Sequence, residues 1–186
     1  MAEEWPKIRS RRTIAISQWM DVVAREVEFA EGADPQIYHA VAQLDYLAVV
    51  AVTPDGRIPI VRQYRPAVEA FTWELPAGLI ERGEEPAAAC ARELLEETGY
   101  PALAVHSLGA PAAACTGRLS NSVHSFFVTT GECVEGFVPE PGLTVALKFP
   151  AELAMLIKSG AFVQQLHLGA LLLADLRGFL TLPKAP

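Results

Sequence analysis

Apolar and polar residues alternate along the first part of this chain with a period of about two. The alternation is partial over residues 21–29, and after turn residues at 31–35 a similar pattern continues over 37–44. A period of two places every second side chain on the same face of a strand. The pattern therefore predicts an N-terminal β extension, a hairpin or small sheet, within residues 1–44.

The segments that follow indicate the strands of a central sheet. Residues 46–53 form a nearly continuous apolar run, which is typical of a strand buried on both faces. Pro54-Asp55-Gly56 is a turn sequence, and residues 58–64 predict the strand after it. Further strands are expected at residues 123–129 and 143–149.

Two helices are predicted in the last part of the chain. The first covers residues 150–159 and is opened by Pro150, and the second covers residues 162–173 and continues beyond them. His167 lies in the second helix and is expected to be structural rather than a ligand. The side chains that helical spacing places in the core are Leu166, Leu173 and Leu176.

A further helix is bounded by strong local signals. Pro86 suits a first helical position, Glu84 and Glu85 lie at the positive end of the helix dipole, and Gly99 is a left-handed stop. The predicted helix runs from residue 86 to residue 98. Its two predicted faces are an apolar side of Ala87, Ala88, Ala91, Leu94, Leu95 and Thr98 and an acidic side of Glu93, Glu96 and Glu97.

The acidic side brings three carboxylates together. Glu93, Glu96 and Glu97 repel one another on an isolated helix by about a few tenths of a kcal/mol per pair, unless a cation joins them. Oxygen ligands in this number suit Mg²⁺ or Mn²⁺. Arg92, one turn before Glu96, is placed to hold a carboxylate in position. The alternative is a solvated acidic face without a metal.

Composition and charge narrow the class of protein. The chain has 186 residues, 51% apolar and 20% charged, which fits one globular domain with its own core. A net charge of −7 argues against general nucleic-acid binding, so an anionic substrate requires a local cation. The three cysteines are widely spaced and indicate neither a disulfide framework nor a zinc site. Without a secretory signal or a long apolar stretch, we expect a cytoplasmic protein with no membrane partner.

The stretch from residue 78 to residue 100 resembles the signature of the Nudix hydrolase family. Its fixed residues are Gly78, Glu84, Arg92, Glu93, Leu94, Glu96, Glu97 and Gly99. A chance match to this array is on the order of 1 in 10⁸ at any given start. Tyr100 replaces the commoner aliphatic residue at the last position. The resemblance implies the Nudix fold, an α/β/α sandwich with a mixed central sheet, and a catalytic core over residues 45–186 behind the β extension.

Two motifs narrow the resemblance to the ADP-ribose pyrophosphatase and nucleoside diphosphate-sugar branch. They are Gln63-Tyr64-Arg65 and Trp73-Glu74-Leu75-Pro76-Ala77. Arg65 is then the candidate for binding the diphosphate, because a guanidinium matches phosphate oxygens with two donors; a surface ion pair is the alternative. The resemblance implies substrate contact by Glu74, with a strand ion pair to an arginine as its alternative. It also implies a metal-binding carbonyl at Ala77.

Two loops after the predicted helix bear on specificity and catalysis. Relatives specific for ADP-ribose commonly carry a proline a short way past the signature, where this chain has Cys115. Ser120 lies in the segment that resembles the family's pattern and is a candidate for substrate binding. The resemblance also implies a glutamate base in the flexible loop over residues 132–142, with Glu140 as the candidate and Glu135 as the reserve.

The N-terminal extension carries two candidate base-stacking residues. In the resembling branch this extension is often exchanged between two subunits, so the resemblance implies a homodimer. An aromatic side chain of one chain then stacks on the base bound by the other, and Trp5 and Trp19 are the candidates, with burial as ordinary hydrophobes as the alternative. The basic residues at 7–12 are expected to belong to a solvated tail.

The motifs together predict hydrolysis of the diphosphate bond in a nucleoside diphosphate derivative, ADP-ribose giving AMP and ribose 5-phosphate. Glu93, Glu96 and Glu97, with the Ala77 carbonyl, are expected to hold divalent ions that activate water. Arg65 is expected to position the substrate, and a loop glutamate to take the proton. GDP-mannose or another nucleotide sugar is the alternative substrate, and a nucleotide-sensing domain that does not cleave is a remote alternative.

Overall fold

The computed structural model describes residues 5–183, and the chain divides into two compact units. The first unit comprises the chain up to residue 44 together with residues 113–122, and the second comprises residues 45–112 and the chain from residue 123 onward. The boundary after residue 44 coincides with the predicted start of the catalytic core. The place of residues 113–122 in the first unit was not predicted, and the assignment of one domain to the whole chain stays a prediction.

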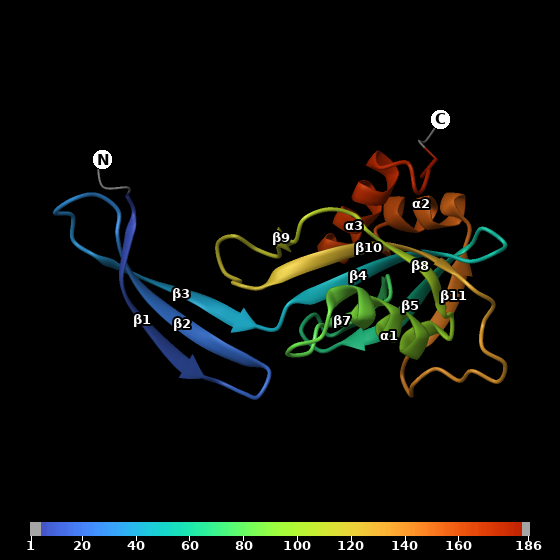
Figure 1. Ribbon diagram of the computed structural model, residues 1–186, viewed down its shortest axis with the longest axis horizontal. Helices are drawn as coiled ribbons and strands as arrows, with labels where there is room; N and C mark the ends of the chain where they lie inside the picture. The colour runs from blue at the N-terminus through green and yellow to red at the C-terminus, as the bar shows by residue number, and fades with distance from the viewer. Residues whose placement is uncertain (1–4, 184–186) are drawn as a thin grey trace. The chain divides into compact units, whose positions relative to one another are not determined.

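The first unit contains an antiparallel sheet with the strand order β1-β2-β3 (Figure 1). Its strands are β1 (Lys7–Ala15), β2 (Met20–Glu28) and β3 (Gln36–Gln43). The expected solvated tail over residues 7–12 is therefore wrong, because this segment pairs with β2, with a register shift between Ile8 and Ser10. Their basic side chains are compatible with the strand since most of them stay at the surface, where Arg9 forms an ion pair with Glu28.

The second unit contains a five-stranded and a three-stranded sheet. In the larger sheet, with the order β7-β4-β10-β8, β4 and β10 are parallel and the other neighbours are antiparallel. The strands are β4 (Tyr46–Val52), β7 (Ala77–Leu79), β8 (Ala102–Ser107), β9 (Ala112–Ala113) and β10 (Ser122–Thr130). The smaller sheet has the order β11-β5-β6, formed by β5 (Ile58–Arg65), β6 (Ala70–Glu74) and β11 (Thr144–Lys148). Strands β6, β7, β8 and β9 were not predicted, because their short segments show no clear period.

Helices pack on both faces of the larger sheet. They are α1 (Pro86–Thr98), α2 (Pro150–Lys158) and α3 (Gln165–Leu176). Alternate residues of β4 belong to two cores: Leu47 and Val49 pack with α1, whereas Ala48 and Val50 pack with α2 and α3 (Figure 1). This arrangement confirms the predicted α/β/α sandwich with a mixed sheet. Among residues 5–183, no helix is both long enough and apolar enough to span a membrane.

Helix α1 has the predicted bounds but buries a different face. Its buried side chains are Ala89, Cys90, Leu94 and Thr98. Three residues predicted for the core are exposed, namely Ala87, Ala88 and Leu95. The prediction placed the apolar arc too far around the helix, because the contact with the sheet is centred near Cys90. Glu93 and Glu97 consequently lie at the margin of this contact and are half-buried, whereas Glu96 is exposed.

Helix α3 also packs through residues other than those predicted. Its buried side chains are His167, Ala170, Leu171 and Ala174. Leu176 was predicted to lie in the core and is 71% exposed, while Leu166 and Leu173 are partly buried. Small alanines on the buried face allow close approach of the helix to the sheet, so the larger leucines lie to the side of the contact.

Candidate active site

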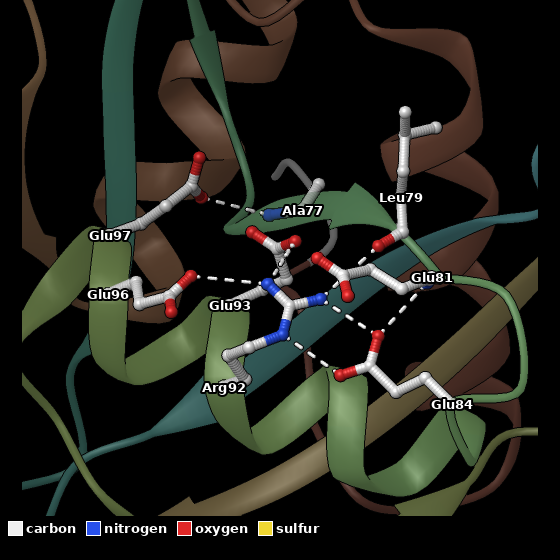
Figure 2. Close-up of polar contacts among 8 residues, drawn as sticks. All are labelled: Ala77, Leu79, Glu81, Glu84, Arg92, Glu93, Glu96 and Glu97. Atoms are coloured by element: carbon white, nitrogen blue, oxygen red, sulfur yellow. Dashed lines mark hydrogen bonds and ion pairs between the residues drawn. The ribbon is translucent and has the colours of Figure 1, made fainter. Parts of the chain in front are cut away.

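Strand β7, the loop after it and helix α1 bring the signature residues together (Figure 2). Pro86 occupies the first turn of the helix, and Gly99 ends it with a φ of 74° and an amide bonded to the Leu95 carbonyl at 2.9 Å. Gly78 lies against the helix, where an added Cβ would be 2.1 Å from the carboxyl carbon of Glu93. The strand therefore approaches α1 so closely that only a glycine leaves room for the Glu93 carboxylate.

Arg92 binds three carboxylates of the signature (Figure 2). Its Nε and Nη2 donate to the two oxygens of Glu84 at 2.9 and 3.0 Å, and its Nη1 donates to Glu93 at 2.8 Å and to Glu96 at 3.1 Å. Nη2 also donates to the Leu79 carbonyl at 3.3 Å. The bonds between Arg92 and Glu84 are the main reason that the pKa of Arg92 is raised and that of Glu84 is lowered. The predicted orienting contact of Arg92 with a carboxylate is thus present.

Glu97 is held by the backbone of β7 instead of by Arg92 (Figure 2). The Ala77 amide donates to its Oε2 at 3.0 Å. Burial raises the pKa of Glu97 to about 8, and the charges of Glu93 and Glu74 act in the same direction against this hydrogen bond and Arg65. The hydrogen bond and Arg65 only partly offset the cost of burying the charged form of this carboxyl group.

The three clustered carboxylates do not converge on one point. Arg92 engages Glu93 and Glu96, and the Ala77 amide engages Glu97. Within residues 5–183, no group of three or more His, Cys, Asp or Glu side chains is arranged to hold a metal ion. The donor chemistry nevertheless fits a hard divalent cation, because burial raises the pKa of both Glu93 and Glu97 and a cation would relieve that cost. Their role as metal ligands stays a prediction.

Arg65 and Glu74 form a bidentate ion pair between β5 and β6. Arg65 Nε and Nη2 donate to Glu74 at 2.8 and 2.5 Å, and the Thr72 hydroxyl donates to Glu74 at 2.6 Å. Burial raises the pKa of Glu74, but the bonds from Arg65 and Thr72 outweigh it and lower the pKa overall. Glu74 is only 1% exposed, whereas the Arg65 side chain is 36% exposed. The ion pair considered as an alternative for both residues is therefore present, and it leaves the guanidinium partly accessible.

A hydrogen-bonded chain behind this ion pair was missed by the sequence analysis. The Leu75 amide donates to His167 Nδ1 at 3.0 Å, and His167 Nε2 lies 3.0 Å from the Tyr46 hydroxyl oxygen. His167 is fully buried, which agrees with its predicted structural role. A lone tyrosine at the start of an apolar strand gives no sequence signal for such a contact.

The loop between β10 and β11 is fastened to the end of α1. The Val134 amide donates to the Gly99 carbonyl at 2.9 Å, and the Phe137 ring occupies the space that a Cβ on Gly99 would need. Glu135 and Glu140 are exposed in this loop. Among the described residues, no hydrogen bond or ion pair joins either glutamate to the signature carboxylates, so the choice of base stays a prediction.

The remaining candidates lie in the first unit. Trp19 is 61% exposed in the turn between β1 and β2, so the alternative of ordinary burial does not apply to it. Trp5 is partly buried, and Lys7 Nζ lies 4.7 Å from the centre of its ring. The Ser120 hydroxyl and amide both donate to the Val41 carbonyl, at 3.2 and 3.0 Å. Ser120 therefore fastens residues 113–122 to β3, and its contact with substrate stays a prediction.

An α/β/α sandwich with an acidic strand–loop–helix site around Arg92 is the architecture of the Nudix class of proteins. The NUDIX domain family matches residues 44–158, and the chain belongs to this family. The resemblance seen in the signature is thereby confirmed.

Named relatives match through a part of their length. The ADP-ribose pyrophosphatase of Bacillus subtilis (strain 168) is 38% identical over 96 residues, which cover 52% of this chain and 51% of that protein. The ADP-sugar pyrophosphatase of Mus musculus is 41% identical over 87 residues, which cover 45% of this chain and 39% of that protein. The chain thus spans about half, or less, of these curated relatives. A solved structure, "Crystal structure of ADP compounds hydrolase", matches with a TM-score of 0.75 and 25% identity over 96% of this chain and 98% of that chain.

Proposed function

We propose that the protein hydrolyses the diphosphate bond of a nucleoside diphosphate derivative. The observation that carries the proposal is the Nudix signature in its folded form, with Arg92 bound to Glu84, Glu93 and Glu96 beside the half-buried Glu97. Two carboxyl groups with raised pKa values, Glu93 and Glu97, close to an arginine fixed by hydrogen bonds suit phosphate chemistry assisted by cations. An intact signature also argues against the remote alternative, a nucleotide-sensing domain that does not cleave.

ADP-ribose is the proposed substrate, with AMP and ribose 5-phosphate as the products. The two motifs around Arg65 and Glu74 support this choice, and so do the ADP-ribose and ADP-sugar pyrophosphatases among the relatives. Cys115 stands where relatives specific for ADP-ribose commonly have proline. GDP-mannose or another nucleotide sugar is therefore kept as the alternative substrate.

The mechanism assigns a separate task to each part of the site. Glu93, Glu96 and Glu97, with the Ala77 carbonyl, would hold Mg²⁺ or Mn²⁺, which when bound lowers the pKa of water and neutralises charge on the diphosphate. Arg92 keeps two of these carboxylates oriented toward the site. The partly exposed Arg65 guanidinium binds phosphate oxygens and is itself fixed by the buried Glu74.

The proton released by the attacking water passes to Glu140 in this proposal, with Glu135 in reserve. Both glutamates are exposed, so either could accept a proton and exchange it with solvent. Their loop follows β10 in the sequence and is fastened to the carboxyl end of α1 by the hydrogen bond from Val134 to Gly99.

We also propose that the protein acts as a homodimer, with the first unit as the contact between subunits. The exposed large apolar side chains of this unit include Ile16, Trp19, Phe29, Ile37 and Tyr38. Exposed apolar groups in such number mark an interaction surface, and a second copy of the chain is the proposed partner. Trp19, or else Trp5, then stacks on the substrate base, and Ser120 contributes a hydrogen bond.

A substrate panel tests the function. The purified protein is incubated with Mg²⁺ and ADP-ribose, GDP-mannose, other nucleotide sugars, dinucleotides or nucleoside triphosphates, and the products are identified. We expect AMP and ribose 5-phosphate from ADP-ribose at the highest rate. GDP-mannose turning over tenfold faster moves the assignment to the alternative substrate, and the absence of any product supports a domain that binds without cleaving.

A further inference from the structure

The hydrogen-bonded chain of Leu75, His167 and Tyr46 has no task in the mechanism above. All three residues belong to the second unit, and Leu75 directly follows Glu74 of the ion pair. The rings of Tyr46 and His167 lie nearly parallel, with 4° between their planes, and the hydroxyl meets the imidazole at 3.0 Å. This chain connects β4, α3 and the segment before β7 directly behind the proposed diphosphate site.

The direction of each hydrogen bond follows from the Leu75 amide, which can only donate. Nδ1 of His167 therefore accepts and carries no proton. His167 is neutral, since burial lowers its pKa to about 4, and its one ring proton must lie on Nε2. Nε2–H then donates to the Tyr46 oxygen, which leaves the phenolic hydrogen of Tyr46 for another acceptor. Within residues 5–183 that hydroxyl has no other hydrogen-bond partner.

The surroundings of Tyr46 point to an anionic acceptor supplied from outside the chain. Tyr46 is half-buried at the start of β4, where it pairs with Leu79 of β7. Burial, followed by the charge of Glu74, raises the pKa of Tyr46, so the phenol keeps its proton. Arg65 and Glu97 are the next charges that act on the hydroxyl. The phenol is thus within electrostatic range of both the guanidinium that would bind phosphate and a carboxylate that would hold cations.

We propose that the Tyr46 hydroxyl donates a hydrogen bond to a phosphate oxygen of the diphosphate substrate, and that His167 is a positioning residue which holds the hydroxyl in this orientation. The inference rests on the proposed function, because it takes a nucleoside diphosphate as the ligand. Arg65 provides charge at this site, and Tyr46 adds a neutral donor whose direction is fixed by the buried imidazole. Such a donor favours a correctly placed phosphate without adding charge.

Tyr46→Phe tests the contact, because it removes one oxygen and keeps the ring. Kinetics are measured with ADP-ribose and Mg²⁺, and the dissociation constant of ADP is measured by calorimetry. We expect KM and the ADP dissociation constant to rise about tenfold, as for the loss of a hydrogen bond to a charged oxygen, with kcat within about twofold of wild type. Tyr100→Phe, on a partly buried tyrosine just after α1, is the matched control and should change neither value.

A different outcome is expected if the Tyr46 hydroxyl has only a structural role. Removing the Tyr46 oxygen then lowers the melting temperature, because the buried Nε2–H loses its acceptor, but leaves the ADP dissociation constant unchanged. That result overturns the proposal. His167→Leu provides a second test: it should weaken ADP binding in the wild-type background and have no further effect in Tyr46→Phe. If His167→Leu does not fold, the ADP dissociation constants of Tyr46→Phe and wild type still test the proposal.

Failure of the proposed function is distinguishable from failure of this inference. A wild type that binds ADP but cleaves nothing in the substrate panel overturns the hydrolase activity, while the ADP dissociation constants still test Tyr46. A wild type that cleaves ADP-ribose, with Tyr46→Phe unchanged in KM, overturns the inference and leaves the activity intact. A wild type that binds neither ADP nor ADP-ribose overturns both.

Discussion

Two acidic residues of α1, Glu93 and Glu97, lie where the helix meets the sheet and not on its solvent side. Burial raises the pKa of both carboxyl groups, and Arg92 forms a hydrogen bond with Glu93 but not with Glu97. The Ala77 amide supplies Glu97 with a hydrogen bond but with no net charge. The metal-free site is therefore electrostatically unfavourable at the level of single residues, and a bound divalent ion would relieve it.

Glu97→Gln separates the metal role of this residue from its structural role. Glutamine keeps an oxygen for the Ala77 amide and removes the charge, so the melting temperature in EDTA should stay level or rise slightly. Activity should almost vanish. Added Mg²⁺ should stabilise wild type by about 2.7 kcal/mol at a hundred times its dissociation constant, and the variant far less. Equal shifts by Mg²⁺ in both proteins, with surviving activity, would support the solvated acidic face instead.

At the scale of elements, the sequence predicts α1 well because its two ends carry their own signals. Pro86 and Gly99 define the bounds, and the spacing of Arg92 and Glu96 predicts their ion pair. Which face of the helix is buried could not be predicted, because alanines are compatible with either face and the sheet decides the contact. An ion pair was expected as an alternative for Arg65 and for Glu74 separately because each is charged, but the sequence did not pair them with each other. The Tyr46–His167 contact joins residues far apart in the sequence, and neither residue type indicates the other.

The loop between β10 and β11 is the element that should supply the base. Glu140→Gln is expected to lower kcat by about 10²- to 10⁴-fold, with KM for substrate and Mg²⁺ nearly unchanged, because it removes a proton acceptor and no binding contact. Glu135→Gln changes an equally exposed glutamate of the same loop and should keep wild-type turnover. The reverse result, a slow Glu135→Gln and an active Glu140→Gln, makes Glu135 the base.

Helix α3 should give the stability of the second unit a specific pH dependence. Burial lowers the pKa of His167 from 6.5 to about 4, so between these values the unfolded chain binds a proton that the folded chain does not. The stabilisation from the neutral ring is complete above about pH 6.5 and is lost as the pH falls to about 4, at most about 3 kcal/mol.

Urea unfolding of wild type and His167→Leu at several pH values measures this contribution. Other titrating groups act on both proteins, so the difference in unfolding free energy between them should shrink as the pH falls from 7 to 4.5. His39→Gln, which changes an exposed histidine of β3, should retain the wild-type slope. A difference that is constant with pH would show that His167 is not buried in its neutral form.

At the scale of the whole molecule, the chain combines a Nudix unit with an antiparallel sheet that buries few of its own side chains. Ala24 and Val27 are the buried apolar residues of that sheet among those described, while larger side chains such as Ile37 are exposed. A three-stranded sheet with so small a core gains stability from a partner surface. The strand period predicted the extension, but it could not predict that residues 113–122 join it.

The proposed dimer is tested by sedimentation velocity. Wild type should sediment as a species of twice the chain mass, and Ile37→Asp should shift it toward monomer, because Ile37 is 67% exposed on β3 and a carboxylate there opposes an apolar contact. Leu103→Asp is the matched control, since Leu103 is 73% exposed on β8 of the other unit, and it should stay dimeric. A monomeric wild type at micromolar concentration would contradict the homodimer.

The parallel pairing of β4 with β10 has a consequence for how the protein folds. Tyr46 lies beside Val123 and Val52 beside Thr129, so the two middle strands of the sheet come from distant parts of the chain, with α1 between them. Closing so long a loop costs entropy before any contact compensates for it, which slows folding. During synthesis the acidic helix leaves the ribosome before β10 does, and one edge of β4 stays unpaired meanwhile. The newly made chain therefore passes through a stage in which the signature carboxylates have been synthesised but the sheet next to them is incomplete.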